Sequence, residues 1–503
     1  MASFHLLTLI IFIPLVGCLL SLVLWRHPNQ VRWVSLIVLI GDMFFAFFSF
    51  SYLGAAAGPG GAWIVEERIP WIKYFGVTYS LSLDGISLVL ILMTAFLGVL
   101  CVLISWREIT TKVASFHFFI LLTQTGVLGV FLATDLFLFY LFWEIQLIPV
   151  FFLIGVWGHD KHLRVHAAVK FFLYSMAGSL LMLIAIIGLY LIHGSQTGNY
   201  TFALSELMNT HMSIGTESWL YAAFLLAFAI KVPLFPVHTW LPDAHTEAPT
   251  AGSVDLAGLL LKTGTYAILR FAFPLFPNAA QKSVPILIIL GLIGMFYAAW
   301  IALAQKDLKR LVAYSSIGHM GLIIIGIAVW SNITLSGAVL LMVNHGISTS
   351  ALFIMVGMLS ERTNSREFDV LGGVWKQMPI YSGFFLLFGL ATLGLPGLNN
   401  FVSEILILVG TFKKYPIVAV IAFFSTVFVL IYALRMVQDA LFGQPRVEHQ
   451  LWDITPREAL ILISLALIVI FLGLHPDPVL NLLDNPVQAL IDQTGRIMTA
   501  QVM

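Results

Sequence analysis

Four ionisable side chains lie deep inside largely apolar stretches of sequence: Glu144, Lys231, Lys262 and Glu404. A charge at the centre of a bilayer costs about 2.5–3.5 kcal/mol on insertion scales, so each of these groups needs a partner, water or a function there. Glutamate and lysine both take up and release protons. Burial favours the neutral form of each side chain, whereas a nearby opposite charge favours the charged form. These residue types therefore predict proton movement inside a membrane.

Histidines and hydroxyl groups extend this set. Four histidines lie in or beside the apolar stretches: His238, His245, His319 and His345. Three pairs have helical spacing: Asp255 with Lys262, Ser315 with His319, and His345 with Ser348. Taken singly, each histidine also fits a core residue with satisfied hydrogen bonds, and each pair fits a buried polar contact. Together they predict a polar line that crosses several helices in the membrane plane.

The pairing of Glu144 with Lys231 suggests how this line would work. We expect the proton on Lys231 to depend on the distance between the ammonium and the Glu144 carboxylate. When the pair opens, Lys231 releases its proton along the line, and when it closes, Lys231 reloads. Lys262 and the histidines would then relay the proton through water, and Glu404 would be the last carrier.

The elements that must position these residues are membrane spans. The chain is 60% hydrophobic and 10% charged, with a mean hydropathy of +0.97, whereas soluble proteins carry about 25% charged residues. Apolar runs of about 20 residues, the length that crosses a ~30 Å hydrocarbon core, predict fourteen spans: 3–25, 32–53, 85–106, 115–133, 135–157, 165–193, 218–246, 250–274, 284–304, 307–330, 334–359, 378–412, 414–442 and 456–474. The first run has no basic segment or cleavage site before it and is kept as a span. Helices satisfy the backbone in lipid, so we expect one all-α polytopic membrane domain over residues 1–503.

Two of these spans are predicted to break near mid-depth. Lys231 begins the sequence KVPLFP, and Glu404 ends the sequence LGLPGLNNFVSE. Proline removes a helix donor and clashes with the preceding turn. The two breaks fall in spans 7 and 12, five apart, which is typical of inverted repeats with a site at the midplane. We therefore expect one repeat over about 115–274, spans 4–8, and a second over about 284–442, spans 9–13.

The distribution of lysine and arginine predicts the orientation. Fourteen of these residues lie in or beside odd-numbered loops, and five lie in even-numbered loops: Arg68, Lys73, Lys282, Lys413 and Lys414. We expect the odd loops to face the cytoplasm and both termini to lie outside. Lys170, Arg270 and Arg435 lie nearer span ends, where long stems reach the interface, and Asp42 in span 2 is left without a role.

Several kinds of chemistry have no support in the sequence. There is no G-x-G-x-x-G after a strand, no P-loop, no haem-attachment motif and no cysteine cluster, because Cys18 and Cys101 stand alone. The net charge is zero, which gives no reason to expect nucleic acid. We therefore expect no cofactor in this chain and an energy source in a partner subunit or an ion gradient.

Four long motifs resemble those of the antiporter-like subunits of respiratory complex I: LFWEIQLIPVFFLIGVWG, FAIKVPLFPVHTWLPDAHTEAPTAGSVDLAGLLLKTG, QKDLKRLVAYSSIGHMG and LGLPGLNNFVSEILIL. The resemblance covers nearly the whole chain. It implies fourteen helices with inverted repeats over spans 4–8 and 9–13. It also implies site roles: an ion pair of Glu144 and Lys231, a central relay at Lys262, connecting histidines His319 and His345, a terminal carrier at Glu404, and His238 and His245 in the broken-helix loop.

The resemblance implies a setting as well. The whole enzyme oxidises NADH, reduces a quinone and moves protons outward, with NADH, flavin and iron–sulfur clusters in other subunits. Subunits L and N carry lysine in the second broken span, whereas the subunit between them carries glutamate, as Glu404 does here. Subunit L also has a long lateral helix after its last span, and we expect none after span 14. A bacterial plasma membrane is the expected location, with an organelle membrane as the alternative.

Three other interpretations stay open. A subunit of a multi-subunit sodium/proton antiporter would share the fold, although lysine is expected there in place of Glu404. A membrane subunit linked to a hydrogenase would share it too. A scaffold without transport is disfavoured. Each charged side chain within a span costs about 3 kcal/mol to insert into the membrane, and a scaffold gains nothing in return.

Overall fold

The structure is a computed structural model that describes residues 5–52, 63–447 and 449–502. In these residues thirteen helical stretches are long and apolar enough to cross a membrane. The longer helices of the first half are α1 (Leu6–Val23), α2 (Pro28–Phe48), α3 (Gly85–Glu108), α4 (Val113–Leu132), α5 (Leu136–Ile145), α6 (Leu147–Trp157), α7 (Leu163–Thr197), α9 (Ile214–Lys231) and α10 (Trp240–Glu247). Those that follow are α14 (Pro277–Leu303), α15 (Leu308–Val329), α16 (Asn332–Thr363), α18 (Pro379–Thr392), α19 (Asn399–Lys414), α20 (Pro416–Leu441), α21 (Pro456–Leu474) and α22 (Asp477–Val502).

Between α10 and α14 the predicted span 8 is a composite helix. It consists of α11 (Thr250–Val254), a π-helical segment η3 (Asp255–Leu260), α12 (Leu261–Ala267), a second π-helical segment η4 (Ile268–Ala272) and α13 (Phe273–Leu275). The remaining short elements are η1 (Ser49–Tyr52), η2 (Lys73–Phe75), α8 (Leu204–Leu207) and α17 (Val374–Gln377). The π turns were not predicted, and they change which side chains share a face, because a π turn takes more residues than an α turn.

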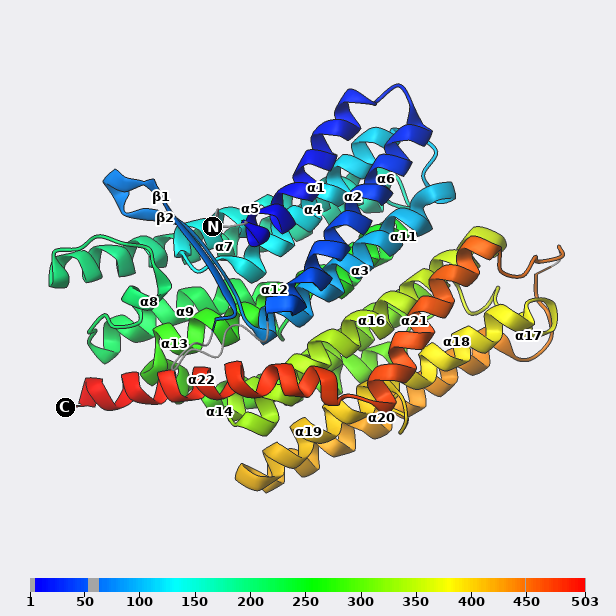
Figure 1. The fold of residues 1–503 in the computed structure, drawn as a ribbon. Helices are drawn as coiled ribbons and strands as arrows, with labels where there is room; N and C mark the ends of the chain where they lie inside the picture. The colour runs from blue at the N-terminus through cyan, green and yellow to red at the C-terminus, as the bar shows by residue number, and fades with distance from the viewer. Residues whose placement is uncertain (1–4, 53–62, 448, 503) are drawn as a thin grey trace.

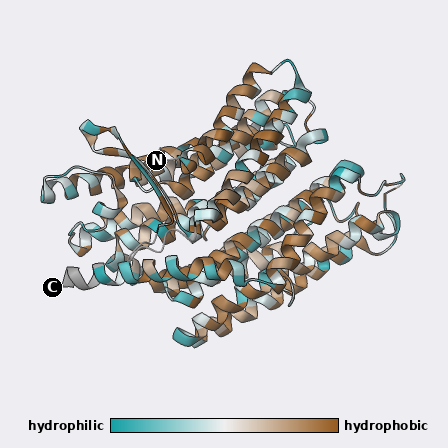
Figure 2. Ribbon diagram, viewed as in Figure 1, coloured by the Kyte–Doolittle hydropathy of each residue, from teal (hydrophilic) through white to brown (hydrophobic). Residues whose placement is uncertain are grey.

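The helices form an apolar bundle with a fully enclosed centre. Figure 2 shows apolar residues along the helices and polar ones mainly toward their ends. The outer helices α7 and α20 expose many large apolar side chains, as lipid-facing or subunit-facing helices do. By contrast, the composite helix over 250–275 and helix α16 are surrounded by other helices. These two central helices carry Lys262 and His345.

Two spans are broken, as predicted. Helix α9 ends at Lys231 and α10 begins at Trp240, and the Trp240 indole Nε1 donates to the Ile230 carbonyl across the gap at 2.9 Å. Helix α18 ends at Thr392 and α19 begins at Asn399. Prolines end the first helix, whereas the second break turns at Gly394 and Gly397, with φ of +76° and +91°. With α18 and α19 counted as one broken span, the described part of the chain holds fourteen spans. The division into repeats stays a prediction.

One end of the bundle carries structure that the sequence analysis missed. The connection at about 54–84 holds a two-stranded antiparallel hairpin, β1 (Val65–Ile72) and β2 (Val77–Leu83), and residues 53–62 lie outside the described residues. The 26-residue helix α22 follows the last span and packs across the ends of α3, α13, α14 and α16. A helix therefore lies across the bundle after span 14, where none was expected. The start of α1, the hairpin and α22 lie at the same end of the bundle (Figure 1), as an even number of spans requires.

Candidate functional site

Lys262 and His345 form the centre of the site. The Lys262 ammonium lies 2.7 Å from His345 Nδ1 and also donates to the carbonyl of Ala257 on the preceding π turn. Both side chains are fully buried, and His345 Nε2 has no hydrogen-bond partner within the described residues. A lysine and a histidine in direct contact can pass one proton between them.

His319 continues the line from His345 toward Glu404. The two histidine rings lie 5.2 Å apart between centroids. His319 Nδ1 lies 2.9 Å from the Ser315 carbonyl, and Nε2 lies 3.1 Å from the Thr392 carbonyl and 3.6 Å from Glu404 Oε1. Whichever nitrogen carries the proton therefore has an acceptor, and the predicted Ser315–His319 contact is made through the Ser315 backbone.

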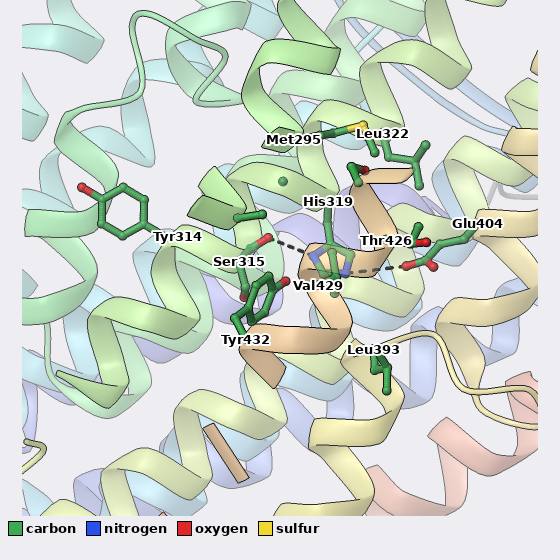
Figure 3. Close-up of a pocket in the computed structure, with 13 residues that line it drawn as sticks. Met295, Tyr314, Ser315, His319, Leu322, Leu393, Glu404, Thr426, Val429 and Tyr432 are labelled. Carbon is green, nitrogen blue, oxygen red and sulfur yellow. Dashed lines mark hydrogen bonds and ion pairs between the residues drawn. The ribbon is translucent and has the colours of Figure 1, made fainter. Parts of the chain in front are cut away.

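Glu404 and His319 face a small cavity, which Figure 3 shows in close-up. Its volume is about 20 Å³, room for about one water. Its polar lining includes Ser315, Thr426 and Tyr432. Tyr432, which lines this cavity together with Ser315, was missed because a single tyrosine in an apolar helix carries no sequence signal.

The second break places the Glu404 carboxylate against its own loop. A Cβ at Gly394 would lie 2.5 Å from Glu404 Oε2, so a larger residue there would displace the carboxylate. The positive φ of Gly394 also favours glycine. The break at 393–398 thus shapes the place where Glu404 meets His319.

The two histidines near the first break have different surroundings. His245 in α10 stacks on Phe353 of α16 with ring centroids 4.6 Å apart and lies within electrostatic range of Lys262 and His345, beside the line. His238 instead packs between Phe235 and Tyr297 at 5.6 and 5.0 Å, on the side of the break that faces α14. The structure therefore does not bring His238 into the line.

Glu144 and Lys231 are near each other but not in contact. The Lys231 ammonium lies over the ring of Trp143 at 5.2 Å and near that of Phe171 at 5.9 Å. Glu144 lies within its electrostatic range, but no N–O distance of 4.0 Å or less joins the two. Glu144 Oε1 also has no hydrogen-bond partner among the described residues. The structure therefore holds the pair apart.

Asp255 and Lys262, predicted from their spacing to share one helical face, bind different partners. Asp255 Oδ1 accepts from Gln124 Nε2 at 3.1 Å and from Cys101 Sγ at 3.4 Å. The segment from Asp255 to Leu260 is π-helical, so a spacing of seven no longer returns to the same face. The Ser348 hydroxyl donates to Asn399 Oδ1 at 3.0 Å.

The charges nearer span ends behave in three ways. Arg435 is exposed and bonds Asp439 Oδ2 at 3.1 Å, as expected for a long stem at a helix end. Lys170 is half-buried and pairs with Asp243 at 2.7 Å. Arg270 does not reach the interface, because its guanidinium is buried in an ion pair with Asp84.

Asp42, which was left without a role, is fully buried, and neither carboxyl oxygen has a hydrogen-bond partner in the described part of the chain.

A larger polar cavity of about 340 Å³ lies between the ends of α3, α15 and α16. Its charged lining consists of Arg107, Glu108, His159, Lys309, Glu361 and Arg366. Burial, followed by the nearby charges of Arg366 and Lys309, lowers the pKa of the His159 imidazole in the α6–α7 loop. Lys309 donates to the Ala248 carbonyl and lies within electrostatic range of His245. This cavity therefore approaches the line from one end of the bundle.

Apolar helices, two broken spans and a buried lysine–histidine–glutamate line define a class of polytopic membrane proteins that carry ionisable side chains within the bilayer. Residues 133–429 match the family described as NADH:quinone oxidoreductase/Mrp antiporter, transmembrane. The chain is 44% identical to NADH-quinone oxidoreductase subunit M of Pseudomonas aeruginosa, over 94% of this chain and 95% of that one. It therefore belongs to this family, with the subunit M proteins as its relatives, and the resemblance stated from its motifs is confirmed.

Solved structures agree with this assignment. A chain of respiratory complex I from Thermus thermophilus with bound NADH is 29% identical, with a TM-score of 0.86 over 97% of this chain and all of that one. A chain of the Mrp complex from Dietzia has a TM-score of 0.84 over 99% of this chain and 100% of that one, at 20% identity. The second match shows a shared fold alone.

Proposed function

We propose that this chain is a membrane-arm subunit of an NADH:quinone oxidoreductase and translocates protons along its buried line. The observation that carries the proposal is the run of close contacts from Lys262 through His345 and His319 to Glu404. No such run is needed to hold a bundle together, and each member is a group that takes up and releases protons.

The proton steps follow from the geometry. Lys262 passes a proton to His345 across 2.7 Å, the adjacent His319 ring receives it, and Glu404 accepts it from His319 Nε2. The gap of 3.6 Å to Glu404 calls for a small movement or for the water that the neighbouring cavity can hold. Glu404 is then the terminal carrier.

Protons would be taken up through the larger cavity. Lys309 lines it and lies near His245, which in turn lies near Lys262. Lys231 would respond to Glu144: their separation in this structure fits the open state of the pair, in which Lys231 releases its proton. Closure would reload Lys231.

The proposed setting is a bacterial plasma membrane, with odd loops toward the cytoplasm and both termini outside. Membrane subunits L and N would be the neighbours, in contact with this chain and with lipid. NADH, flavin, iron–sulfur clusters and quinone would be held in or between other subunits, and quinone reduction there would supply the energy.

A sodium/proton antiporter subunit is the alternative. The shared fold with the Mrp chain supports it. The 44% identity to subunit M proteins and the presence of Glu404 favour the redox-driven enzyme. The same two observations also favour the NADH:quinone oxidoreductase over a subunit of a membrane-bound hydrogenase.

The test is Lys231→Ala in the assembled native complex in membrane vesicles. NADH-driven quinone reduction and the pH gradient, read with a pH-sensitive dye, are recorded together. We expect both to fall while the complex stays assembled, because Lys231 belongs to a coupled proton path. If both are unchanged and sodium/proton exchange without a redox substrate is lost instead, the antiporter function is correct.

A further inference from the structure

We propose that Asp243 is a positioning residue that latches the half-helix α10 to both predicted repeats and so holds His245 in the proton line. This inference rests on the proposed function, since it gives the half-helix a task in proton transfer. It concerns a carboxylate that the line itself does not use.

The geometry of the latch is a single carboxylate between two cations from different helices. Asp243 Oδ2 lies 2.7 Å from Lys170 Nζ on α7, and Asp243 Oδ1 lies 3.1 Å from an Arg310 guanidinium nitrogen on α15. Helix α7 belongs to the first predicted repeat and α15 to the second. All three side chains are partly exposed, so each bond alone contributes little stability. The arrangement nevertheless fixes α10 from two sides.

Cations of the second predicted repeat also hold the far end of α10. An Arg366 guanidinium nitrogen donates to the Thr246 carbonyl at 2.6 Å, and Lys309 donates to the Ala248 carbonyl. Carbonyls in the last turn of a helix lack partners within the helix, and cations there are favourable. On the same half-helix, Asp243 pairs with two further cations, Lys170 and Arg310.

The half-helix needs such support. It has eight residues and follows the break at 232–239, and isolated helices of that length are not stable. His245 makes no side-chain hydrogen bond within the described residues, since both ring nitrogens lack partners, and its ring rests flat on Phe353. The position of this ring therefore depends on the position of α10.

The experiment uses Asp243→Asn in the assembled complex, with Asp439→Asn as the matched control. Asp439 also pairs with an arginine, Arg435 at 3.1 Å, but lies on the exposed side of α20 away from the line. Hydrogen–deuterium exchange of a peptide covering 240–247 is measured beside NADH turnover and the pH gradient. We expect faster exchange in Asp243→Asn and a fall in turnover and gradient of about tenfold to a hundredfold, since a misplaced transfer group costs that much.

Asp243→Glu should restore both readouts in large part, which a loss of folding would not allow. Unchanged exchange and turnover in Asp243→Asn would overturn the latch. If Asp243→Asn does not assemble, Arg310→Met and Lys170→Met test the same contacts from the other side. Each should raise exchange at 240–247, and exchange equal to that of the native complex in both would likewise overturn it. The exchange readout reports on the latch alone, whereas Lys231→Ala reports on the proposed function.

Discussion

At the scale of single residues, the line works because its groups are buried and close but incompletely partnered. His345 Nε2, both nitrogens of His245 and Glu144 Oε1 have no hydrogen-bond partner in the described part of the chain. Buried polar atoms are almost always satisfied in proteins, so unsatisfied ones call for a functional explanation or for water. Unsatisfied buried atoms also occur elsewhere, as at Asp42, but His345 is in direct contact with Lys262, and Glu144 lies within electrostatic range of Lys231.

Glu144→Gln tests the electrostatic pair. The amide keeps the size of the side chain but removes the charge that acts on Lys231. The proton on Lys231 should then no longer depend on the distance to residue 144. We expect the NADH-driven pH gradient to fall by about tenfold or more, equivalent to about 1.4 kcal/mol, with the amount of assembled complex unchanged. The gradient is measured in vesicles with a pH-sensitive dye, beside Glu206→Gln, an exposed carboxylate whose bond to Arg68 is 3.4 Å long. Native transport in Glu144→Gln would remove this pair from the mechanism.

At the scale of elements, the two breaks do different things. The first break separates Lys231, at the end of α9, from His245 on the half-helix α10. The second sets the loop at 393–398 against the Glu404 carboxylate. The π turns on either side of α12 have a third effect, because they direct Asp255 toward Gln124 and leave the Ala257 carbonyl to Lys262.

Gly394→Ala tests the second break. A side chain at φ +76° costs about 1–2 kcal/mol, and its Cβ would lie 2.5 Å from Glu404 Oε2. The carboxylate must therefore move away, and the distance to His319 changes. We expect the pH gradient and NADH turnover to fall together by about tenfold or more.

Gly383→Ala is the matched control. It lies in the interior of α18, where an added Cβ meets nothing within 4 Å, and alanine is favoured over glycine in helices. Transport should stay at the native level there. Equal activity in the two variants would mean that the fit of Glu404 against its loop does not matter for transport.

At the scale of the whole molecule, the sequence predicts what local physics determines. Hydropathy marks the spans, and the prolines around Lys231 and the glycines before Glu404 mark the breaks, because both effects act within a few residues. The π turns at 255–260 and 268–272 have no such residue signal. The buried pair of Arg270 with Asp84 joins residues far apart in sequence. Helix α22 lacks the length of apolar sequence that marks a span, and the separation of Glu144 from Lys231 is set by packing.

The orientation of the whole bundle can be tested directly. Lys161→Cys lies in the exposed turn between α6 and α7, and Asn209→Cys lies in the exposed connection after α8, on opposite sides of the predicted span 6. The two native cysteines, Cys18 and Cys101, are buried and should react little with a membrane-impermeant maleimide. The excess of lysine and arginine in odd loops predicts that Asn209→Cys is labelled in right-side-out vesicles and Lys161→Cys only in inverted ones.

The same result would place the larger cavity on the cytoplasmic side, because Lys161 and His159 share one loop and His159 lines that cavity. The opposite labelling pattern would reverse the direction in which the line carries protons.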